Sequence, residues 1–102
     1  MRRIVRSCTY VNQLKDFLDQ GALLFGEAVA AQTLHHIDRS LENNIALFPN
    51  KKPDPRLGLI VYPVSQTPFI LLYDFDDAEI RVHFILHAST DRSQVDPKAV
   101  EW

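Results

Sequence analysis

Apolar residues in the first part of the chain follow two different spacings. In residues 2–8, two adjacent β-branched residues stand between arginines, which predicts a short strand. Apolar residues three or four positions apart then run through residues 11–25 and form one stripe of a helix. We expect Thr9 to cap this helix and Gly26 to end it.

A second stripe of the same spacing covers residues 30–48, and Pro49 stops that helix. Because a single glycine-containing joint separates the two helices, the pattern predicts a helical hairpin. Residues 49–55 contain three prolines and two adjacent lysines, Lys51 and Lys52. This segment is predicted to be a loop that displays positive charge.

Three runs rich in β-branched and aromatic residues follow, at residues 57–62, 68–75 and 79–87. Their short connections predict an antiparallel meander. Residues 89–102 are mostly polar and predict a loop with one turn near Pro97. The whole order predicts one α+β domain over residues 1–102, with the helical hairpin on one face of a small sheet.

Alternation along the last strand assigns its side chains to two faces of the sheet. The set expected in the core is Ile80, Val82, Phe84 and Leu86. The set expected on the opposite face is Arg81, His83, Ile85 and His87. We expect this second face to be uncovered, and its guanidinium and imidazole groups suit phosphate binding and proton transfer.

The composition of the chain limits the classes of protein to which it can belong. A chain of 102 residues that is 46% hydrophobic and 24% charged is one ordinary globular domain. Its 11 Lys and Arg against 13 Asp and Glu give a net charge of -2, which does not favour nucleic acid as a basic domain does. The bases nevertheless cluster at residues 2–6 and 51–56, and the acids at 74–79.

The single cysteine, Cys8, excludes an internal disulfide, and we expect a reducing cytoplasm. His35 and His36 lack a third ligand at the right spacing, so we expect no metal and no cofactor. No apolar run approaches the roughly 18 residues that span a bilayer, and the start does not look like a signal peptide.

Several strings resemble the RelE/ParE superfamily of bacterial toxins from type II toxin-antitoxin systems. These are FGEAVA at residues 25–30, the helix end at 41–49, PFILLY at 68–73 and IRVHFILH at 80–87. The resemblance covers residues 2 to about 92. It implies a small cytoplasmic toxin from a plasmid-stabilisation system. Such a toxin inhibits growth and is held inactive by a cognate antitoxin.

Two activities occur in this superfamily, and the resemblance leaves both open. RelE-like members cut messenger RNA bound in the ribosome without a metal, whereas ParE-like members inhibit DNA gyrase without the ribonuclease residues. Metal-free cleavage needs an acid, a base and cations around the phosphorane. The candidates for acid and base are His83 and His87, those for the cationic clamp are Arg81 and Arg92, and those for further phosphate contacts are Lys51, Lys52 and Arg56.

The C-terminal part departs from the RelE-like pattern. The family's basic residue followed by Asp is reversed here as Asp91-Arg92, and Trp102 stands where the tail often carries a catalytic Tyr. An indole does not transfer protons as a phenol does, but it stacks on a base or a partner. With the negative net charge, this favours a ParE-like action on gyrase over a ribosome-dependent endonuclease. A third alternative is an inactive relative that serves as an interaction module.

Ile70 and Leu72 are predicted to lie on the uncovered sheet face together with Arg81 and His83. Apolar side chains exposed on a sheet indicate a protein partner, unless the tail covers them. We therefore expect the antitoxin to bind Ile70 and Leu72 and to neutralise the toxin by occlusion.

Overall fold

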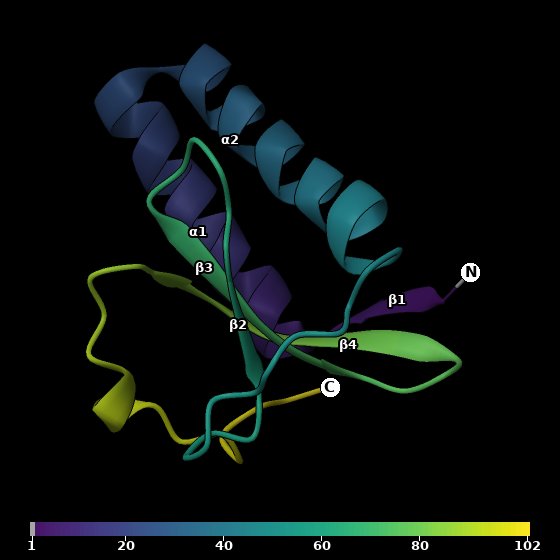
Figure 1. Ribbon diagram of the computed structural model, residues 1–102. Coiled ribbons are helices and arrows are strands. Elements are labelled where there is room, and N and C mark those ends of the chain that lie inside the picture. Colours follow the sequence, from purple (N-terminus) through teal and green to yellow (C-terminus); the bar gives the residue numbers. More distant parts are fainter. Residues whose placement is uncertain (1) are drawn as a thin grey trace.

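The computed structural model describes residues 2–102 and contains a four-stranded sheet with two helices on one face (Figure 1). The strands are β1 (Arg3–Arg6), β2 (Ile60–Pro63), β3 (Phe69–Phe75) and β4 (Glu79–His87). The helices are α1 (Cys8–Phe25) and α2 (Glu27–Arg39), which runs on into a π-helical turn (Ser40–Ile45). A short 3-10 turn (Arg92–Gln94) interrupts the C-terminal segment, defined here as residues 88–102.

The strand order in the sheet is β1-β4-β3-β2. β2, β3 and β4 form the predicted antiparallel meander, whereas β1 pairs in parallel with β4. A parallel neighbour requires a crossover between the two strands, and the helical hairpin is part of that connection. The predicted α+β architecture, with the hairpin on one face, is therefore confirmed.

The start of α1 is fixed by a contact with the sheet. Ser7, not Thr9, is the N-cap, and its Oγ accepts a hydrogen bond from the Tyr10 N–H at 2.9 Å. The same hydroxyl donates to the backbone carbonyl of His83 at 2.7 Å. The prediction of Thr9 as the cap is wrong because this second bond ties Ser7 to β4. Gly26 ends α1 as predicted, at a φ of 93° that favours glycine.

The main core lies between the helices and the sheet. Tyr73 is fully buried there, and its hydroxyl donates to the Pro49 carbonyl at 3.0 Å, which fixes the chain just after the second helix. The other fully or almost fully buried apolar residues of this core are Tyr10, Ile37, Leu41, Ile45, Leu71, Ile80, Val82 and Ile85.

A β-bulge at His83 changes which side chains of β4 face this core. Tyr73 pairs with Val82 but Leu72 pairs with Phe84, so β4 carries one residue more than β3 at this point. Past the bulge the alternation is reversed, and Ile85 is buried in the main core while Phe84 packs on the opposite face. The predicted alternation is therefore right for Ile80 and Val82 and wrong for Phe84, Ile85, Leu86 and also His87, whose ring packs against Phe69 on the helix side of the sheet.

The second face of the sheet is covered, contrary to expectation. The C-terminal segment and the chain before β2 run along the side opposite the helices (Figure 1). Arg56 donates from its guanidinium to the carbonyl oxygens of Arg92 and, at 3.0 Å, of Val95. These contacts close a second core that consists of Leu57, Leu59, Ile70, Leu72 and Phe84, with Val61, Leu86, Val95 and Val100 packed against it.

Candidate functional site

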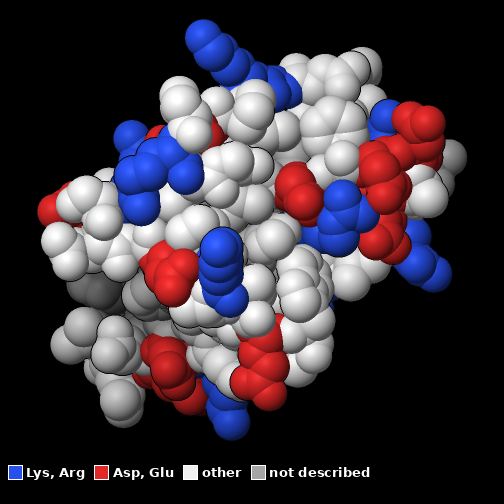
Figure 2. Space-filling model, turned by 90° about the horizontal axis from the view of Figure 1, so that it is seen from below, with Lys and Arg blue, Asp and Glu red and all other residues white. Residues whose placement is uncertain are grey.

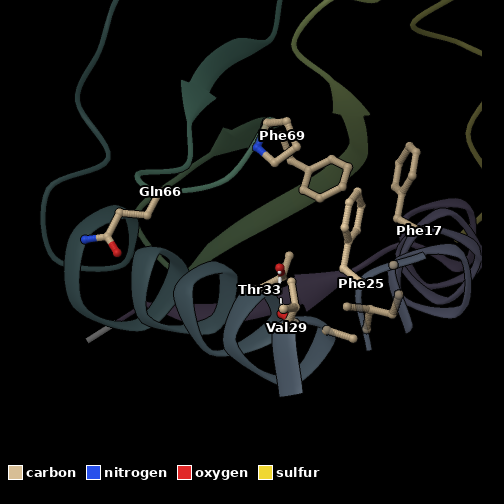
Figure 3. Close-up of a pocket in the computed structure, with 10 residues that line it drawn as sticks. Phe17, Phe25, Val29, Thr33, Gln66 and Phe69 are labelled. Atoms are coloured by element: carbon tan, nitrogen blue, oxygen red, sulfur yellow. Dashed lines mark hydrogen bonds between the residues drawn. The ribbon is translucent and has the colours of Figure 1, made fainter. Parts of the chain in front are cut away.

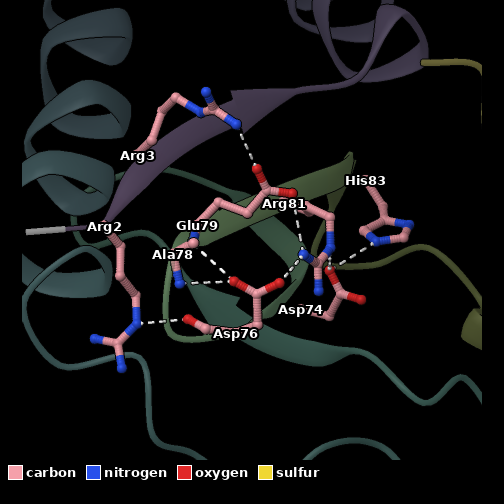
Figure 4. Close-up of polar contacts among 8 residues, drawn as sticks. All are labelled: Arg2, Arg3, Asp74, Asp76, Ala78, Glu79, Arg81 and His83. Carbon is pink, nitrogen blue, oxygen red and sulfur yellow. Dashed lines mark hydrogen bonds and ion pairs between the residues drawn. The ribbon is translucent and has the colours of Figure 1, made fainter.

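Arg81 lies at the centre of a cluster of carboxylates on β3, β4 and the turn between them (Figure 4). Its Nε donates to Asp74 Oδ1 at 2.9 Å, and its Nη1 lies 2.8 Å from Asp76 Oδ2 and 3.1 Å from Glu79 Oε1. Glu79 also pairs with Arg3 at 2.8 Å. The guanidinium is thus held by three carboxylates through its Nε and Nη1.

The charges of the cluster stabilise each other. Hydrogen bonds from Arg81, and then from the Ala78 and Glu79 backbone, lower the pKa of Asp76 to about 2. Hydrogen bonds from Arg3 and Arg81 lower the pKa of the Glu79 carboxyl, and the carboxylates raise the pKa of Arg81 further above its usual value. A phosphate at this place would meet a compensated cation surrounded by negative charge, which is a poor clamp.

His83 is held between Asp74 and the end of the chain. Its Nε2 lies 3.2 Å from Asp74 Oδ1, and its Nδ1 is buried without a hydrogen-bond partner. Trp102 packs edge-on against the imidazole, with ring centroids 4.8 Å apart. If Nε2 carries the proton that Asp74 accepts, Nδ1 has an acceptor lone pair that Trp102 and the surrounding chain keep from water.

His87 belongs to a different part of the surface. The Ser89 N–H donates to its Nδ1 at 3.1 Å, and the Phe69 ring lies edge-on to it with centroids 6.1 Å apart. His87 lies six positions along β4 from Arg81, roughly 20 Å at the rise of a β-strand. The structure therefore brings Arg81 and His83 together around Asp74 but does not bring His87 to them.

The predicted target-binding residues differ in whether their side chains are already engaged in contacts within the protein. Arg56 is used to hold the C-terminal segment, and the Lys51 ammonium lies over the Tyr62 ring, 5.8 Å from its centroid. Lys52 and Arg92 do come together, at a shallow hollow of about 320 Å³. Figure 2 shows basic and acidic side chains interspersed over the face seen from below, with no continuous positive surface.

Ile70 and Leu72, expected to bind the antitoxin from an open face, are 6% and 0% exposed. The second core covers both, so their side chains are not available while the C-terminal segment is in place. The expectation of an exposed apolar sheet face is wrong, because Leu57 and Leu59 of the chain before β2, together with Val95 and Val100 of the C-terminal segment, cover it. Trp102 remains half-exposed at the end of this cover.

An apolar groove of about 380 Å³ opens instead between the two helices and the start of β3. The rings of Phe17, Phe25 and Phe69 face the same space (Figure 3), and Phe17 and Phe69 pack with centroids 4.7 Å apart. The remaining lining residues are Leu18, Gly21, Val29, Ala30, Thr33, Gln66 and Pro68.

The hairpin tip beside the groove is unusually apolar for a surface. Leu23, Leu24 and Phe25 are 87%, 74% and 70% exposed. The run of three apolar residues at 23–25 indicates this exposed surface in the sequence, although the three- and four-residue spacing of the helical stripe does not. Three consecutive apolar residues on a helix cannot all face one core, since successive side chains point about 100° apart.

Among residues 2–102, no three His, Cys, Asp or Glu side chains come together as metal ligands would. In the same range, none of the helices combines the length and apolar character needed to cross a bilayer.

Comparisons with known proteins give a match of fold only. No protein-family model and no curated protein sequence matches the chain. A chain of the solved structure described as "Chromosomal ParDE TA system from P. aeruginosa" superposes with a TM-score of 0.71 at 17% identity. The match covers 85% of this chain and 96% of that chain. The chain therefore has a ParE-like fold, as the sequence resemblance implied.

Proposed function

We propose that the chain is the toxin of a ParDE-like toxin-antitoxin pair, which inhibits growth until a cognate antitoxin binds it. The observation that carries this proposal is the apolar groove of the hairpin and its exposed tip, on a ParE-like fold. Contiguous apolar surface on a small domain marks a protein interaction site. A toxin needs such a surface for the partner that neutralises it.

The antitoxin would place apolar side chains of one segment in this groove, among Phe17, Phe25 and Phe69. An amphipathic helix suits such a groove because it presents apolar residues along one face. This moves the proposed antitoxin contact from Ile70 and Leu72, which the C-terminal segment covers, to the helical hairpin. Neutralisation would follow from occlusion of the hairpin rather than of the sheet.

For the cellular target we propose DNA gyrase in the cytoplasm, reached through protein contacts as in ParE-like toxins. The neutralised Arg81, the covered His83 and the distant His87 support this choice over cleavage of messenger RNA in the ribosome. An enzyme that binds RNA gains much of its affinity from phosphate neutralisation, for which this surface is poorly suited. Inhibition of gyrase requires a contact surface and no proton transfer.

The proposal is tested by induction of the protein in a bacterium, together with assays on the purified chain. We expect growth arrest and loss of supercoiling by purified gyrase, with Arg81→Lys and His83→Gln both still active and folded by circular dichroism. New 5′ ends on ribosome-bound transcripts, with supercoiling intact, would identify a RelE-like endonuclease instead. Absence of growth arrest would identify an interaction module.

A further inference from the structure

A polar pocket of about 310 Å³ lies between the end of α2 and the connection from β2 to β3. It is lined by His35, His36, Arg39, Ser40, Asn43, Asn44, Ser65 and Gln66. An adjoining hollow shares His35, His36 and Gln66. None of these lining residues is acidic, although acids outnumber bases in the whole chain. The pocket is thus a local concentration of hydrogen-bond donors in an acidic protein.

Two irregularities of the backbone meet at this pocket. One wall is the π-helical turn Ser40–Ile45, in which the Ala46 N–H donates to the Leu41 carbonyl at 2.9 Å. The other wall carries Gln66, whose φ of 64° makes it the one non-glycine residue with positive φ in residues 2–102. Both features cost conformational energy and are found preferentially at functional sites.

Gln66 occupies a position that glycine or asparagine would take with less strain. Its side chain extends from the turn toward α2 (Figure 3), and it lines the polar pocket. A glycine would allow the same turn with less strain, but it would have no side-chain amide to line the pocket. The strained residue therefore supplies a polar group that the turn itself does not need.

The donors of the pocket fit an oxyanion. Arg39 offers a planar fork of N–H groups, and it forms no ion pair within residues 2–102, unlike Arg3 and Arg81. The two imidazoles and the amide of Gln66 lie around the same space. Asn44 is already engaged, because its amide donates to the Tyr62 hydroxyl at 3.0 Å.

We propose that this pocket binds a phosphate group, with Arg39 as its principal ligand and Gln66 as a second donor. A tetrahedral phosphate accepts several hydrogen bonds at once, which matches donors that converge from a helix and a turn. The volume is at the lower end of the range of ligand pockets, so the group attached to the phosphate would be small. The pocket shares Gln66 with the wall of the antitoxin groove, but its other lining residues lie outside that groove, and phosphate binding requires neither the antitoxin nor the gyrase contact proposed above.

The test is a titration of the ¹⁵N-labelled full chain with inorganic phosphate, followed by NMR at constant pH and ionic strength. We expect saturable shifts of the Arg39 side-chain N–H, the Gln66 amide and the backbone at residues 65–66. Arg39→Gln should weaken binding by about tenfold, as loss of a charged hydrogen bond does. The matched control is Lys15→Gln, which removes an exposed cation of α1 outside the pocket and should leave the affinity unchanged.

Gln66→Gly separates binding from folding. It removes the amide and relieves the positive φ, so we expect weaker phosphate binding together with a higher melting temperature. A variant that lost binding because it was poorly folded would melt lower.

Parallel titrations with adenosine 5′-monophosphate and adenosine distinguish a nucleotide phosphate from free phosphate. If the nucleotide binds more tightly than inorganic phosphate and adenosine does not bind, the ligand of the pocket is a nucleotide phosphate. If the nucleotide and inorganic phosphate bind equally, the ligand is free phosphate. The proposal is overturned if phosphate causes no saturable shift, or if Arg39→Gln binds it as well as the natural chain does.

Discussion

The indole of Trp102 packs edge-on against the imidazole of His83, with ring centroids 4.8 Å apart. This contact joins the last residue of the described chain to the bulge of β4. It acts together with two hydrogen bonds between Thr9 and Glu101, from the Thr9 N–H at 3.2 Å and to the Thr9 hydroxyl at 2.8 Å. The C-terminal segment is therefore part of the folded domain and not an appended tail.

Trp102→Ala should destabilise the domain. The indole is half-exposed, so the loss is that of a partly buried aromatic contact, about 1–2 kcal/mol, and His83 becomes accessible. In a domain of this size 1 kcal/mol lowers the melting temperature by about 4–8 °C. Thermal unfolding followed by circular dichroism measures this. Glu101→Ala is the control, since only the backbone of Glu101 forms hydrogen bonds to Thr9.

Arg56→Lys should loosen the C-terminal segment without changing the net charge. A lysine ammonium lacks the rigid fork with which Arg56 reaches the carbonyls of Arg92 and Val95. We expect faster hydrogen exchange at residues 95–102 and faster proteolytic cleavage there, with the exchange of β3 and β4 little changed. If the segment of the variant exchanges as slowly as in the natural chain, then the apolar contacts of Val95 and Val100 and the contacts of Thr9 and Trp102 hold it without Arg56.

The cluster around Arg81 predicts a loss of stability in acid. The pKa of Asp76 is lowered from 3.8 to about 2, so its contribution is present above about pH 4 and is lost as the pH falls toward 2. Denaturation between pH 2 and pH 7 should show this decline, and NMR titration of the Asp76 carboxyl should locate it. In Arg81→Gln the pKa of Asp76 should return toward 3.8. Asp77→Asn, which removes a neighbouring acid, should leave the pKa of Asp76 at its lowered value.

The sequence allows the elements to be predicted, but not the contacts made across long separations. The helices and strands follow from periodicity, because each has enough residues to show its repeat. The bulge at His83 cannot be predicted from periodicity, since one extra residue in a strand does not change the types of residue found there. Ser7 and Thr9 are both of residue types that cap helices, and the hydrogen bond from Ser7 to the distant His83 carbonyl favours Ser7.

The candidate site is harder to predict for the same reason. Alternation identifies Arg81 and His83, but the carboxylates that contact them, Asp74 and Asp76, reach them only once β3 and β4 are paired. The cover on the second face comes from Leu57 and Leu59 before β2 and, for the rest, from a few apolar residues in a polar tail, such as Val95. These are too sparse to form a pattern, so the sequence predicts an open face where the structure has a covered one.

Phe25→Ser tests whether the hairpin groove holds the antitoxin. Phe25 is 70% exposed, so stability should change by less than about 0.5 kcal/mol, and growth arrest should persist. Rescue by the product of the adjacent gene should fail, because loss of an aromatic anchor commonly costs about 2 kcal/mol or more in binding. Phe48→Ser is the matched control, since Phe48 is 74% exposed but does not line the groove. If the gene product rescues both variants equally, or if Phe25→Ser abolishes growth arrest, the groove does not serve the antitoxin alone.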